Sequence, residues 1–454
     1  MGNIRWVDAL RVQKGEVIAF VGAGGKTTTM LALARELEAM KWRVLVTTTT
    51  KMWMHQLQNF HTLAANTPPE QISAALDQHG VVSLYGAVDG EKAVGIEPDA
   101  LEFIYHAVKP DALLIEADGA RGLPLKFPRE GEPAIPSFAT LVVPIASMQV
   151  IGQPLDEDYV MNATSLSFSD QTPLNTSTTV YSVRKWLLGG SGKNVPAKTR
   201  LVPILNGTPV ELLGEVRQIA RHAVVHFSRS RTKCREVVIG SSVPGDIAEV
   251  YSHVMGIVLA AGLSTRMGQP KVLMEWRNGE TILDHVLSQI KGRGGVFWSW
   301  VITGATDQAV RDVVYSKSTR AHAKYNPDYA TGEMLSSLKV GLRAMPENIG
   351  AALIVLGDQP SIKHDVVQKV LQKYAETLAP IVAPSYQMKR GHPILIDRSL
   401  WGEILALPDD GAARDVINAH ANEIAYVNVD DDSILRDVDT PEAYQDERRR
   451  AGLI

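Results

Sequence analysis

Cysteine is almost absent from this sequence of 454 residues, since Cys234 is the only one. A single thiol allows no internal disulfide and no cluster of thiolate metal ligands, which fits a reducing compartment. Long apolar runs are also missing: no stretch approaches the roughly 18 residues that a membrane helix needs. The first residues carry charge early and include no apolar signal core. We therefore expect a cytoplasmic protein that does not associate with membranes.

Charge of either sign is nearly balanced, with 46 Lys and Arg, 50 Asp and Glu, and a net charge of -4. This balance argues against a general nucleic-acid-binding protein, although it leaves room for a local basic pocket. The hydrophobic content of 45% and charged content of 21% are typical of a folded globular protein. The length exceeds that of one ordinary core, so we expect two or three domains.

Residues 254–271 are predicted to form a strand followed by a loop of small residues. The strand, 254–259, is a short apolar run of the length that a buried parallel strand has. In the loop, small residues allow the backbone to approach a ligand closely, and Arg266 and Lys271 add two positive charges. Exposed backbone amides beside two cations can hold a polyphosphate. The alternative is an ordinary strand-to-helix turn with two solvated charges.

A carboxylate follows the most apolar strand of the second half, residues 351–356. Asp358 would lie at the carboxyl end of a central strand, where doubly wound α/β folds bind ligands. Because Mg²⁺ prefers oxygen donors and bridges substrate phosphates, we predict that Asp358 is a metal ligand. The alternative is a turn aspartate before a proline.

Several motifs of the second half together resemble the molybdenum cofactor cytidylyltransferases, which belong to the nucleotidyltransferases with a Rossmann-like fold. The loop closely matches L-A-A-G-x-S-x-R-M-G-x-x-K, and the guanylyl branch usually has glycine where this chain has Ala261. Residues 356–360 match L-G-D-Q-P, and residues 390–393 match R-G-H-P. Residues 326–338 and 437–442 resemble two further motifs of that family.

The resemblance implies transfer of CMP from CTP to the terminal phosphate of Mo-molybdopterin, with release of pyrophosphate. It implies catalysis by Arg266, Lys271, Asp358 and Asp439, with Mg²⁺ held by the two aspartates; we favour Asp439 over Asp437 as the second ligand. Ser336 and Ser337 are expected to open a helix. Contacts to the nucleotide and the pterin are expected from Leu259, Ala260, Ala261, Gly262, Ser264, Gly268, Ser336, Ser337, Gly357, Arg390 and His392.

A second glycine loop follows the apolar run 16–21 and precedes residues 30–40, whose apolar residues repeat at helical spacing. Strand, glycine loop, Lys-Thr and helix is the layout of a phosphate-binding loop, in which Lys26 neutralises charge and Thr27 reaches Mg²⁺. Phe20 stands where the strict motif needs glycine, and the shorter form resembles the loop of Mur-type ligases. A structural turn is the alternative. The expected contacts are Gly22, Gly24, Gly25, Lys26, Thr27 and Thr28.

Two other strand ends bear on this predicted site. The apolar run 113–116 leads into Glu116 and Asp118, as a Walker-B strand ends in an acid that holds Mg²⁺ through water. We therefore predict Asp118 as a metal ligand, the alternative being two surface carboxylates before a turn. Residues 201–206 resemble the strand that carries the base-reading asparagine of GTPases, but residues 207–209 do not continue that motif. Base recognition by that route is therefore not expected.

The strings VGAGGKTT, VTTTTKMW and IEADGARGLPLKFP together resemble the YqeC family, accessory proteins linked to selenium-dependent molybdenum hydroxylases. The likeness covers residues 3–235. It implies an accessory domain with a client molybdenum hydroxylase as partner, and it does not settle the activity of that domain. The expectation that this domain binds ATP or GTP comes from the glycine loop.

The sequence thus predicts an α/β protein of two domains. Residues 1–240 would form a P-loop-like domain, 241–253 a linker, and 254–454 a Rossmann-like nucleotidyltransferase domain of the GT-A type. Two other functions stay open. One is a nucleotidyltransferase that uses GTP or ATP or modifies another phosphate acceptor. The other is a non-catalytic carrier that delivers finished cofactor to a hydroxylase.

Overall fold

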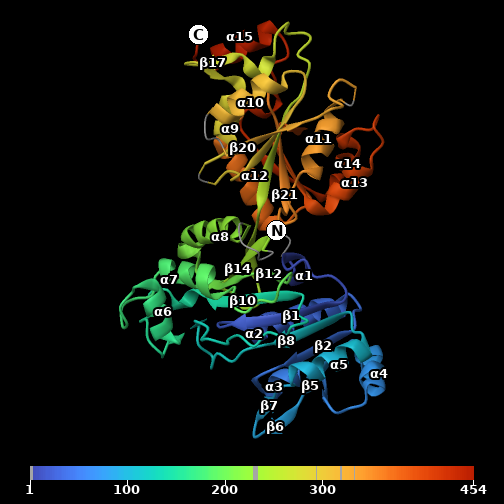
Figure 1. Ribbon diagram of the computed structural model, residues 1–454, viewed down its shortest axis with the longest axis vertical. Coiled ribbons are helices and arrows are strands. Elements are labelled where there is room, and N and C mark those ends of the chain that lie inside the picture. Colours follow the sequence, from blue (N-terminus) through green and yellow to red (C-terminus); the bar gives the residue numbers. More distant parts are fainter. Residues whose placement is uncertain (1–3, 229–233, 293, 317–319, 332) are drawn as a thin grey trace. The chain divides into compact units, whose positions relative to one another are not determined.

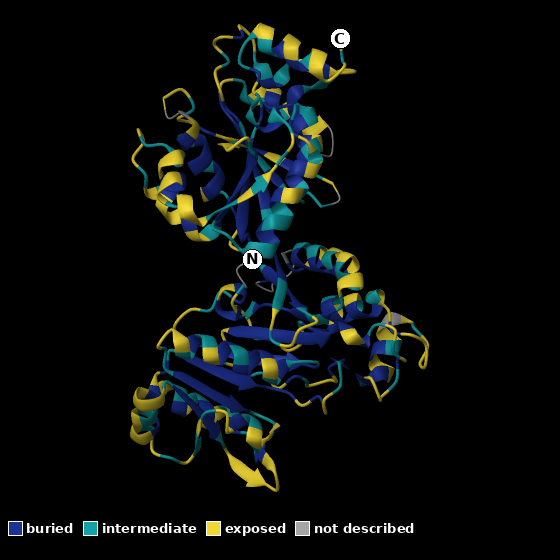
Figure 2. Ribbon diagram, turned by 180° about the vertical axis from the view of Figure 1, so that it is seen from behind, coloured by how far each residue is buried: buried dark blue, intermediate teal, exposed yellow. Residues whose placement is uncertain are grey.

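The computed structural model describes residues 4–228, 234–292, 294–316, 320–331 and 333–454 (Figure 1). The chain divides into two compact units, Met1–Tyr251 and Ser252–Ile454, each built on a mainly parallel sheet. Figure 2 shows the strands of both sheets buried and the outer faces of the helices exposed. The predicted α/β fold with two sheet-based domains is confirmed. None of the described helices combines the length and the apolar character that crossing a bilayer requires.

The sheet of the N-terminal unit has the order β15-β14-β13-β10-β1-β8-β2-β5-β4, with β12 beside β10. The strands from β14 to β4 pair in parallel. All seven residues of β1 are buried, as expected for a central strand covered on both faces. The strands are β1 (Glu16–Gly22), β2 (Val44–Thr48), β4 (His61–Ala64), β5 (Val81–Tyr85), β8 (Ala112–Glu116), β10 (Leu141–Ser147), β12 (Arg200–Leu201), β13 (Ile204–Thr208), β14 (Glu236–Ser241) and β15 (Ile247–Ser252).

Two small sheets and a set of helices complete this unit. In one small sheet, β7 (Lys92–Val94) pairs antiparallel with both β3 (Lys51–Trp53) and β6 (Ala87–Asp89). In the other, β9 (Leu125–Lys126) pairs with β11 (Val160–Met161). The helices are α1 (Trp6–Ala9), α2 (Lys26–Ala39), α3 (Met54–Leu57), α4 (Pro69–His79), α5 (Pro98–Val108), α6 (Ala163–Asp170), α7 (Val180–Lys185) and α8 (Leu213–Ser228).

The sheet of the C-terminal unit has the order β20-β19-β16-β21-β24-β22-β23, with β25 beside β22. The first four strands are parallel, and β24 runs antiparallel to both of its neighbours. The strands are β16 (Val254–Ala260), β19 (Ser299–Thr303), β20 (Ala321–Tyr325), β21 (Ala351–Leu356), β22 (Ile381–Tyr386), β23 (Lys389–Arg390), β24 (Ile394–Asp397) and β25 (Ile424–Asn428). A separate hairpin pairs β17 (Glu275–Arg277) with β18 (Glu280–Thr281).

Helices cover both faces of this sheet (Figure 1). One apolar cluster joins the sheet to α9 (Ile282–Ile290), α10 (Asp307–Ser316) and α12 (His364–Thr377). A second joins it to α11 (Glu333–Arg343), α13 (Trp401–Ala406) and α14 (Ala413–Ala419). The last helix, α15 (Pro441–Arg450), adds Tyr444 to the first cluster.

The segment 241–253, predicted to be a linker, differs from that prediction. Most of it is a turn followed by β15, which lies beside β14 at the edge of the N-terminal sheet. Val250 and Tyr251 on this strand are buried, so it contributes to the core. The small and turn-forming residues of this segment mark the turn between two neighbouring strands. The pairing of β15 depends on a sheet that the local sequence does not reveal.

Candidate active sites

The parallel strands of the C-terminal unit bring four strand ends to one edge of the sheet. Leu259 on β16 is level with Leu356 on β21, and Thr303 on β19 is level with Ala260 and with Tyr325 on β20. The small-residue loop, the Gly-Asp segment and the segment from residue 326 all leave the sheet at this edge. In doubly wound folds this is where ligands bind.

Lys271 stands at the centre of the predicted catalytic group. Its ammonium contacts a carboxylate oxygen of Asp358 and lies 2.7 Å from an oxygen of Asp439. Arg266 approaches the other oxygen of Asp439 at 3.8 Å. The four residues therefore lie together, although 168 positions separate Lys271 from Asp439. The structure places them as the sequence requires for a shared site.

Backbone hydrogen bonds hold the surrounding loops together. The amide of Gly357 donates to the carbonyl of Leu259 (2.9 Å), and the amide of Val438 donates to the carbonyl of Asp358 (3.0 Å). The amide of His392 donates to the carbonyl of Ile434 (3.1 Å). The first two bonds each join two motifs identified in the sequence, and the third joins the R-G-H-P loop to residue 434, just upstream of residues 437–442. The carboxylates and cations are thus carried on loops with fixed backbones.

Charge concentrates around Lys271. Burial lowers the pKa of Lys271, but the Asp358 and Asp439 carboxylates outweigh this effect and the net shift is upward. Burial raises the pKa of Asp437, and the negative charges of Asp439 and Asp358 raise it further. Three carboxylates, those of Asp358, Asp437 and Asp439, therefore lie close together. The Lys271 ammonium contacts two of them, Asp358 and Asp439. Such a region favours an additional cation.

The small-residue loop between β16 and Lys271 is open to solvent. The side chain of Arg266 is 76% exposed, so it is accessible to a charged ligand. Ser264 has a left-handed backbone (φ 52°), and its hydroxyl accepts a hydrogen bond from the Lys271 amide at 3.1 Å. A Cβ on Gly262 would meet nothing within 4 Å, so space is present beside this residue. Ser264 thus fixes the backbone that carries Lys271.

Ser336 and Ser337 do not open their helix, because α11 begins at Glu333. Both hydroxyls contact the Asn326 side-chain amide, at 2.8 and 3.0 Å, and Ser337 is buried. Asn326 itself is fully buried, and its backbone amide donates to Thr303 at 2.9 Å. The first turn of α11 is therefore tied to the strand ends by an Asn-Ser network. The spacing of the Asn-Pro motif gave no sign of this network.

The R-G-H-P loop lies at the same edge of the sheet as Asp358. Ile394 pairs with Ile354 in antiparallel register, so the loop that precedes β24 leaves the sheet where β21 ends. Burial lowers the pKa of His392 to about 4, with a further contribution from the Arg390 charge. His392 is therefore neutral at pH 7 and can offer a hydrogen bond but no positive charge. Arg390 donates to the Asn418 side chain at 3.3 Å.

A pH-dependent stability follows from His392 and from His253, whose pKa burial likewise lowers to about 4. Between pH 6.5, the ordinary histidine pKa, and pH 4, these histidines are protonated in the unfolded chain but neutral in the folded chain. The free energy of unfolding therefore falls as the pH falls. We expect each histidine to lower the unfolding free energy by about 2 kcal/mol at pH 5. Urea denaturation at pH 7, 6 and 5 measures this. If His253→Gln and His392→Gln leave the dependence of the unfolding free energy on pH unchanged, the low pKa values of these histidines are contradicted.

In the N-terminal unit, parallel pairing likewise gathers the predicted residues. Phe20 on β1 is level with Glu116 on β8, and Thr48 on β2 is level with Glu116 too. Beyond these positions the Lys26 ammonium lies 3.3 Å from Asp118 and donates to the carbonyl of Gly22 at 2.7 Å. The Thr27 hydroxyl donates to Glu116 at 2.6 Å.

Asp118 is buried among positive groups. It accepts a hydrogen bond from the Gly22 amide at 3.0 Å and lies 3.3 Å from the ammonium groups of both Lys26 and Lys126. Burial raises the pKa of Glu116, while the Lys26 charge acts in the opposite direction. Sequence reasoning assigned no role to Lys126, although the string IEADGARGLPLKFP contains it, because the string does not show that the turn returns Lys126 to Asp118.

The glycines of this loop meet neighbouring backbone or side chains directly. Gly22 has a φ of 88°, and a Cβ there would lie 2.3 Å from the Ile145 carbonyl. A Cβ on Gly24 would lie 2.4 Å from the Ser147 Cβ, and one on Gly25 would lie 2.2 Å from the Asn206 amide nitrogen. The loop is thus packed against the ends of β10 and β13, which only glycine allows.

Replacement of Gly22 by alanine is expected to destabilise the N-terminal unit by roughly 3 kcal/mol or more, because strain and overlap add. Gly131→Ala is the matched control: Gly131 has a similar φ of 80°, but nothing lies within 4 Å of its Cβ position. The control should cost about 1 kcal/mol, the backbone term alone. Urea denaturation of both variants measures the difference, and equal losses would show that the close packing is unimportant.

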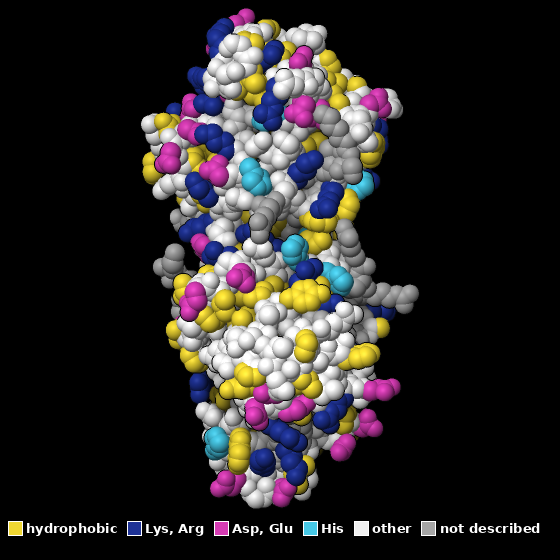
Figure 3. Space-filling view, turned by 90° about the vertical axis from the view of Figure 1, so that its left-hand side faces the viewer, with side chains coloured by type: hydrophobic (Ala, Val, Ile, Leu, Met, Phe, Trp, Pro, Cys, Tyr) yellow, Lys and Arg dark blue, Asp and Glu magenta, His cyan; other side chains and the backbone are white. Residues whose placement is uncertain are grey.

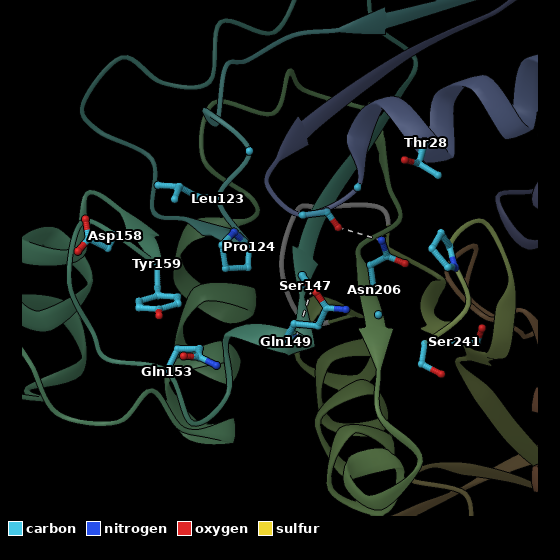
Figure 4. A pocket seen from close by; sticks show the side chains of 16 residues that line it. Thr28, Leu123, Pro124, Ser147, Gln149, Gln153, Asp158, Tyr159, Asn206 and Ser241 are labelled. Carbon is cyan, nitrogen blue, oxygen red and sulfur yellow. Dashed lines mark hydrogen bonds between the residues drawn. The ribbon is translucent and has the colours of Figure 1, made fainter. Parts of the chain in front are cut away.

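Two cavities flank the glycine loop. One, of about 450 Å³, is lined by Lys26, Thr27, Glu116 and residues 50–53. The other, of about 530 Å³, lies toward β10 and β13 (Figure 4). In it the Asn206 side chain donates to the Gly24 carbonyl at 2.8 Å, and Ser147 and Gln149 lie beside it. The resemblance of residues 201–206 to the GTPase strand that carries a base-reading asparagine was thus a signal for Asn206, although residues 207–209 do not continue that motif.

Similarity to known proteins agrees with this division of the chain. Residues 18–164 match the family model described as YqeC protein, and residues 256–424 match the MobA-like NTP transferase domain. The uncharacterized protein YqeC of Escherichia coli K12 is 32% identical over 205 residues, which cover 44% of this chain and 79% of that protein. The molybdenum cofactor cytidylyltransferase of the same organism is 27% identical over 190 residues, which cover 41% of this chain and 92% of that protein.

A solved structure, Rv0371c from Mycobacterium tuberculosis H37Rv, is 25% identical and covers 44% of this chain and 99% of its own, with a TM-score of 0.38. The two sheets, the two groups of site residues and the family matches together define a two-domain α/β protein with a nucleotidyltransferase domain. The chain belongs to the YqeC family, and its C-terminal half is a MobA-like NTP transferase domain.

Proposed function

We propose that the C-terminal unit transfers CMP from CTP to the terminal phosphate of Mo-molybdopterin and releases pyrophosphate. The observation that carries this proposal is the placement of Lys271 between Asp358 and Asp439, beside Arg266. Support for Mo-molybdopterin as the acceptor comes from the relative named as a molybdenum cofactor cytidylyltransferase. The match covers 92% of the length of that relative. Support for cytidine comes from Ala261, where the guanylyl branch usually has glycine.

The donors of this region suit Mg²⁺. Asp358 and Asp439 supply hard carboxylate oxygens, and the raised pKa of Asp437 reports excess negative charge nearby. Within the described residues, no group of three or more His, Cys, Asp or Glu side chains could hold a metal alone. Phosphate and water oxygens would complete the shell, as is usual for Mg²⁺. When bound, Mg²⁺ supplies charge neutralisation at the α-phosphate.

The chain's own groups then bring two polyanions together. Lys271 leaves the carboxylates to contact the triphosphate, and Arg266 holds the departing pyrophosphate. Gly262 and Gly268 let the backbone approach the phosphates. No side-chain nucleophile is needed, because the acceptor phosphate attacks directly. Positioning and electrostatic stabilisation therefore supply most of the catalysis.

The test is pyrophosphate release from CTP, GTP and ATP, each with and without molybdopterin. Release that requires CTP and molybdopterin supports the proposal. Release with GTP or ATP, or with another phosphate acceptor, would make the chain a different nucleotidyltransferase. Tight binding of finished cofactor without any nucleotide consumption would make it a carrier.

We further propose that the N-terminal unit binds ATP or GTP at the glycine loop, with Lys26 and Thr27 at the phosphates and Asp118 near the metal. The contacts of Lys26 with Gly22 and Asp118 support this placement. Gly24, Gly25 and Thr28 line both neighbouring cavities, so their backbone is accessible to phosphate. A client molybdenum hydroxylase would then receive the cofactor from a cytoplasmic protein that carries both units.

A further inference from the structure

The two cavities beside the glycine loop differ in their chemistry. The one toward β13 is lined by neutral polar side chains, among them Gln149, Gln153, Asn206 and Ser241 (Figure 4). Among its described lining residues, Asp158 carries the only charge. We call this the amide cavity. Amide side chains of this kind suit the hydrogen-bonding edge of a nucleotide base.

The other cavity is strongly basic, and we call it the basic cavity. Its described lining includes Lys26, Lys51, Lys92 and Arg121, against a single carboxylate, Glu116. The Lys26 ammonium already contacts the buried Asp118 carboxylate and donates to the Gly22 carbonyl of the loop. The other three cations are exposed on the surface of the unit. Figure 3 shows several basic side chains, with acidic ones among them, at the lower end of the N-terminal unit.

The exposed cations of the basic cavity are only lightly engaged. Lys51 pairs with Asp89 at 2.7 Å, and both side chains are more than half exposed. Such exposed pairs contribute little energy and exchange readily for a better anion. Within the described part of the chain, Arg121 has no hydrogen bond or ion pair. The Arg121 backbone is left-handed (φ 52°), a conformation that costs a non-glycine residue conformational free energy.

An aromatic wall distinguishes the basic cavity from a simple anion site. Trp53 lines it and is 44% exposed, which is unusual for so large an apolar side chain. The Lys92 ammonium lies over the Trp53 ring at 4.8 Å from its centre, because Trp53 and Lys92 pair across β3 and β7. A Cβ on Gly95 would lie 2.3 Å from the Thr49 backbone, so this small sheet is closely packed against the end of β2. The wall is therefore formed before any ligand arrives.

We propose that the basic cavity, beyond the nucleotide phosphates that Lys26 and Thr27 would hold, binds a second ligand that carries both a phosphate group and a flat aromatic ring. Lys51, Lys92 and Arg121 contact the phosphate, and Trp53 contacts the ring. The proposal rests on nucleotide binding at the glycine loop, with the base in the amide cavity. The two ligands then meet at Gly24, Gly25 and Thr28, which both cavities share.

The experiment uses the full chain and two probes, flavin mononucleotide for the basic cavity and a fluorescent ATP for the glycine loop and the amide cavity. Stacking on tryptophan quenches flavin fluorescence, so binding is measured directly. Loss of charge-assisted contacts in Lys51→Gln/Lys92→Gln should weaken flavin binding about tenfold or more. Binding of the ATP probe should stay unchanged. Lys14→Gln is the matched control, since Lys14 lies over the Trp42 ring at 5.4 Å and lines neither cavity.

Both probes should bind together. Flavin binding to the wild type that is undetectable, unchanged in the double variant, or displaced by the ATP probe would overturn the proposal. Flavin binding that depends on Lys51 and Lys92 in a protein that binds no ATP or GTP would support the second site. That outcome would refute the proposed nucleotide binding instead, so the two failures are distinguishable.

Discussion

Replacement of Asp358 by asparagine should lower nucleotidyl transfer roughly a thousandfold, the size of effect seen when one preorganised charge-stabilising group is lost. Asparagine keeps the shape of the side chain but lacks the negative charge that would hold a divalent cation and that neutralises Lys271. Folding should change little, because Asp439 still pairs with Lys271 at 2.7 Å and the Asp358 carbonyl still accepts from Val438. Steady-state pyrophosphate release, with urea denaturation alongside, measures both effects.

Asp365→Asn is the matched control for this prediction. Asp365 forms an exposed pair with Lys369 on α12 at 3.4 Å. Its loss should leave turnover unchanged and stability within about 0.5 kcal/mol. Near-normal turnover in Asp358→Asn would remove this carboxylate from the proposed chemistry. A large loss of stability in the same variant would make the activity result a folding effect.

The second large effect is expected at Lys26. Lys26→Met keeps the length of the side chain but removes the charge that faces the phosphates, so ATP or GTP binding to the N-terminal unit should fall about a hundredfold or more. The unit should still fold, because Lys126 continues to neutralise Asp118 at 3.3 Å. Without Lys26 the pKa of Glu116, already raised by burial, should rise further. Fluorescent nucleotide binding measures the loss of affinity.

The C-terminal transferase activity of the same variant is the internal control, since it should be that of the wild type. Lys109→Met, at an exposed lysine that ends α5, controls for loss of a surface charge. Wild-type nucleotide affinity in Lys26→Met would show that the glycine loop is not the nucleotide site. A parallel loss of transferase activity would show that the two units do not act separately.

The strands and loops that carry the sites could be predicted because their signals are local. Residues 17–21, 113–115, 254–259 and 351–356 are apolar runs, and each lies within one of the central strands β1, β8, β16 and β21. Central parallel strands are covered on both faces, so their sequences do not alternate. Glycine follows residues 21 and 356 at once, a carboxylate follows residue 115, and small residues follow residue 259. These residues mark the strand ends where ligands bind.

Other features depend on contacts that are distant in sequence. Asn206 contacts Gly24, which is 182 positions away, and Lys126 contacts Asp118 through a turn whose path the string IEADGARGLPLKFP does not specify. The low pKa of His392 results from burial, which the four letters R-G-H-P do not encode. Ser336 and Ser337 lie within α11 because the helix begins at Glu333, where the family motif gave no start signal. These features could be identified only from the folded structure.

The most direct test of the transferase uses CTP labelled with radioactive phosphorus at either the α- or the γ-phosphate, together with molybdopterin. Attack at the α-phosphate, beside Lys271, Asp358 and Asp439, predicts that the α label enters the pterin product and the γ label leaves as pyrophosphate. Transfer of the γ label to the acceptor, or no transfer of either label, would contradict the account.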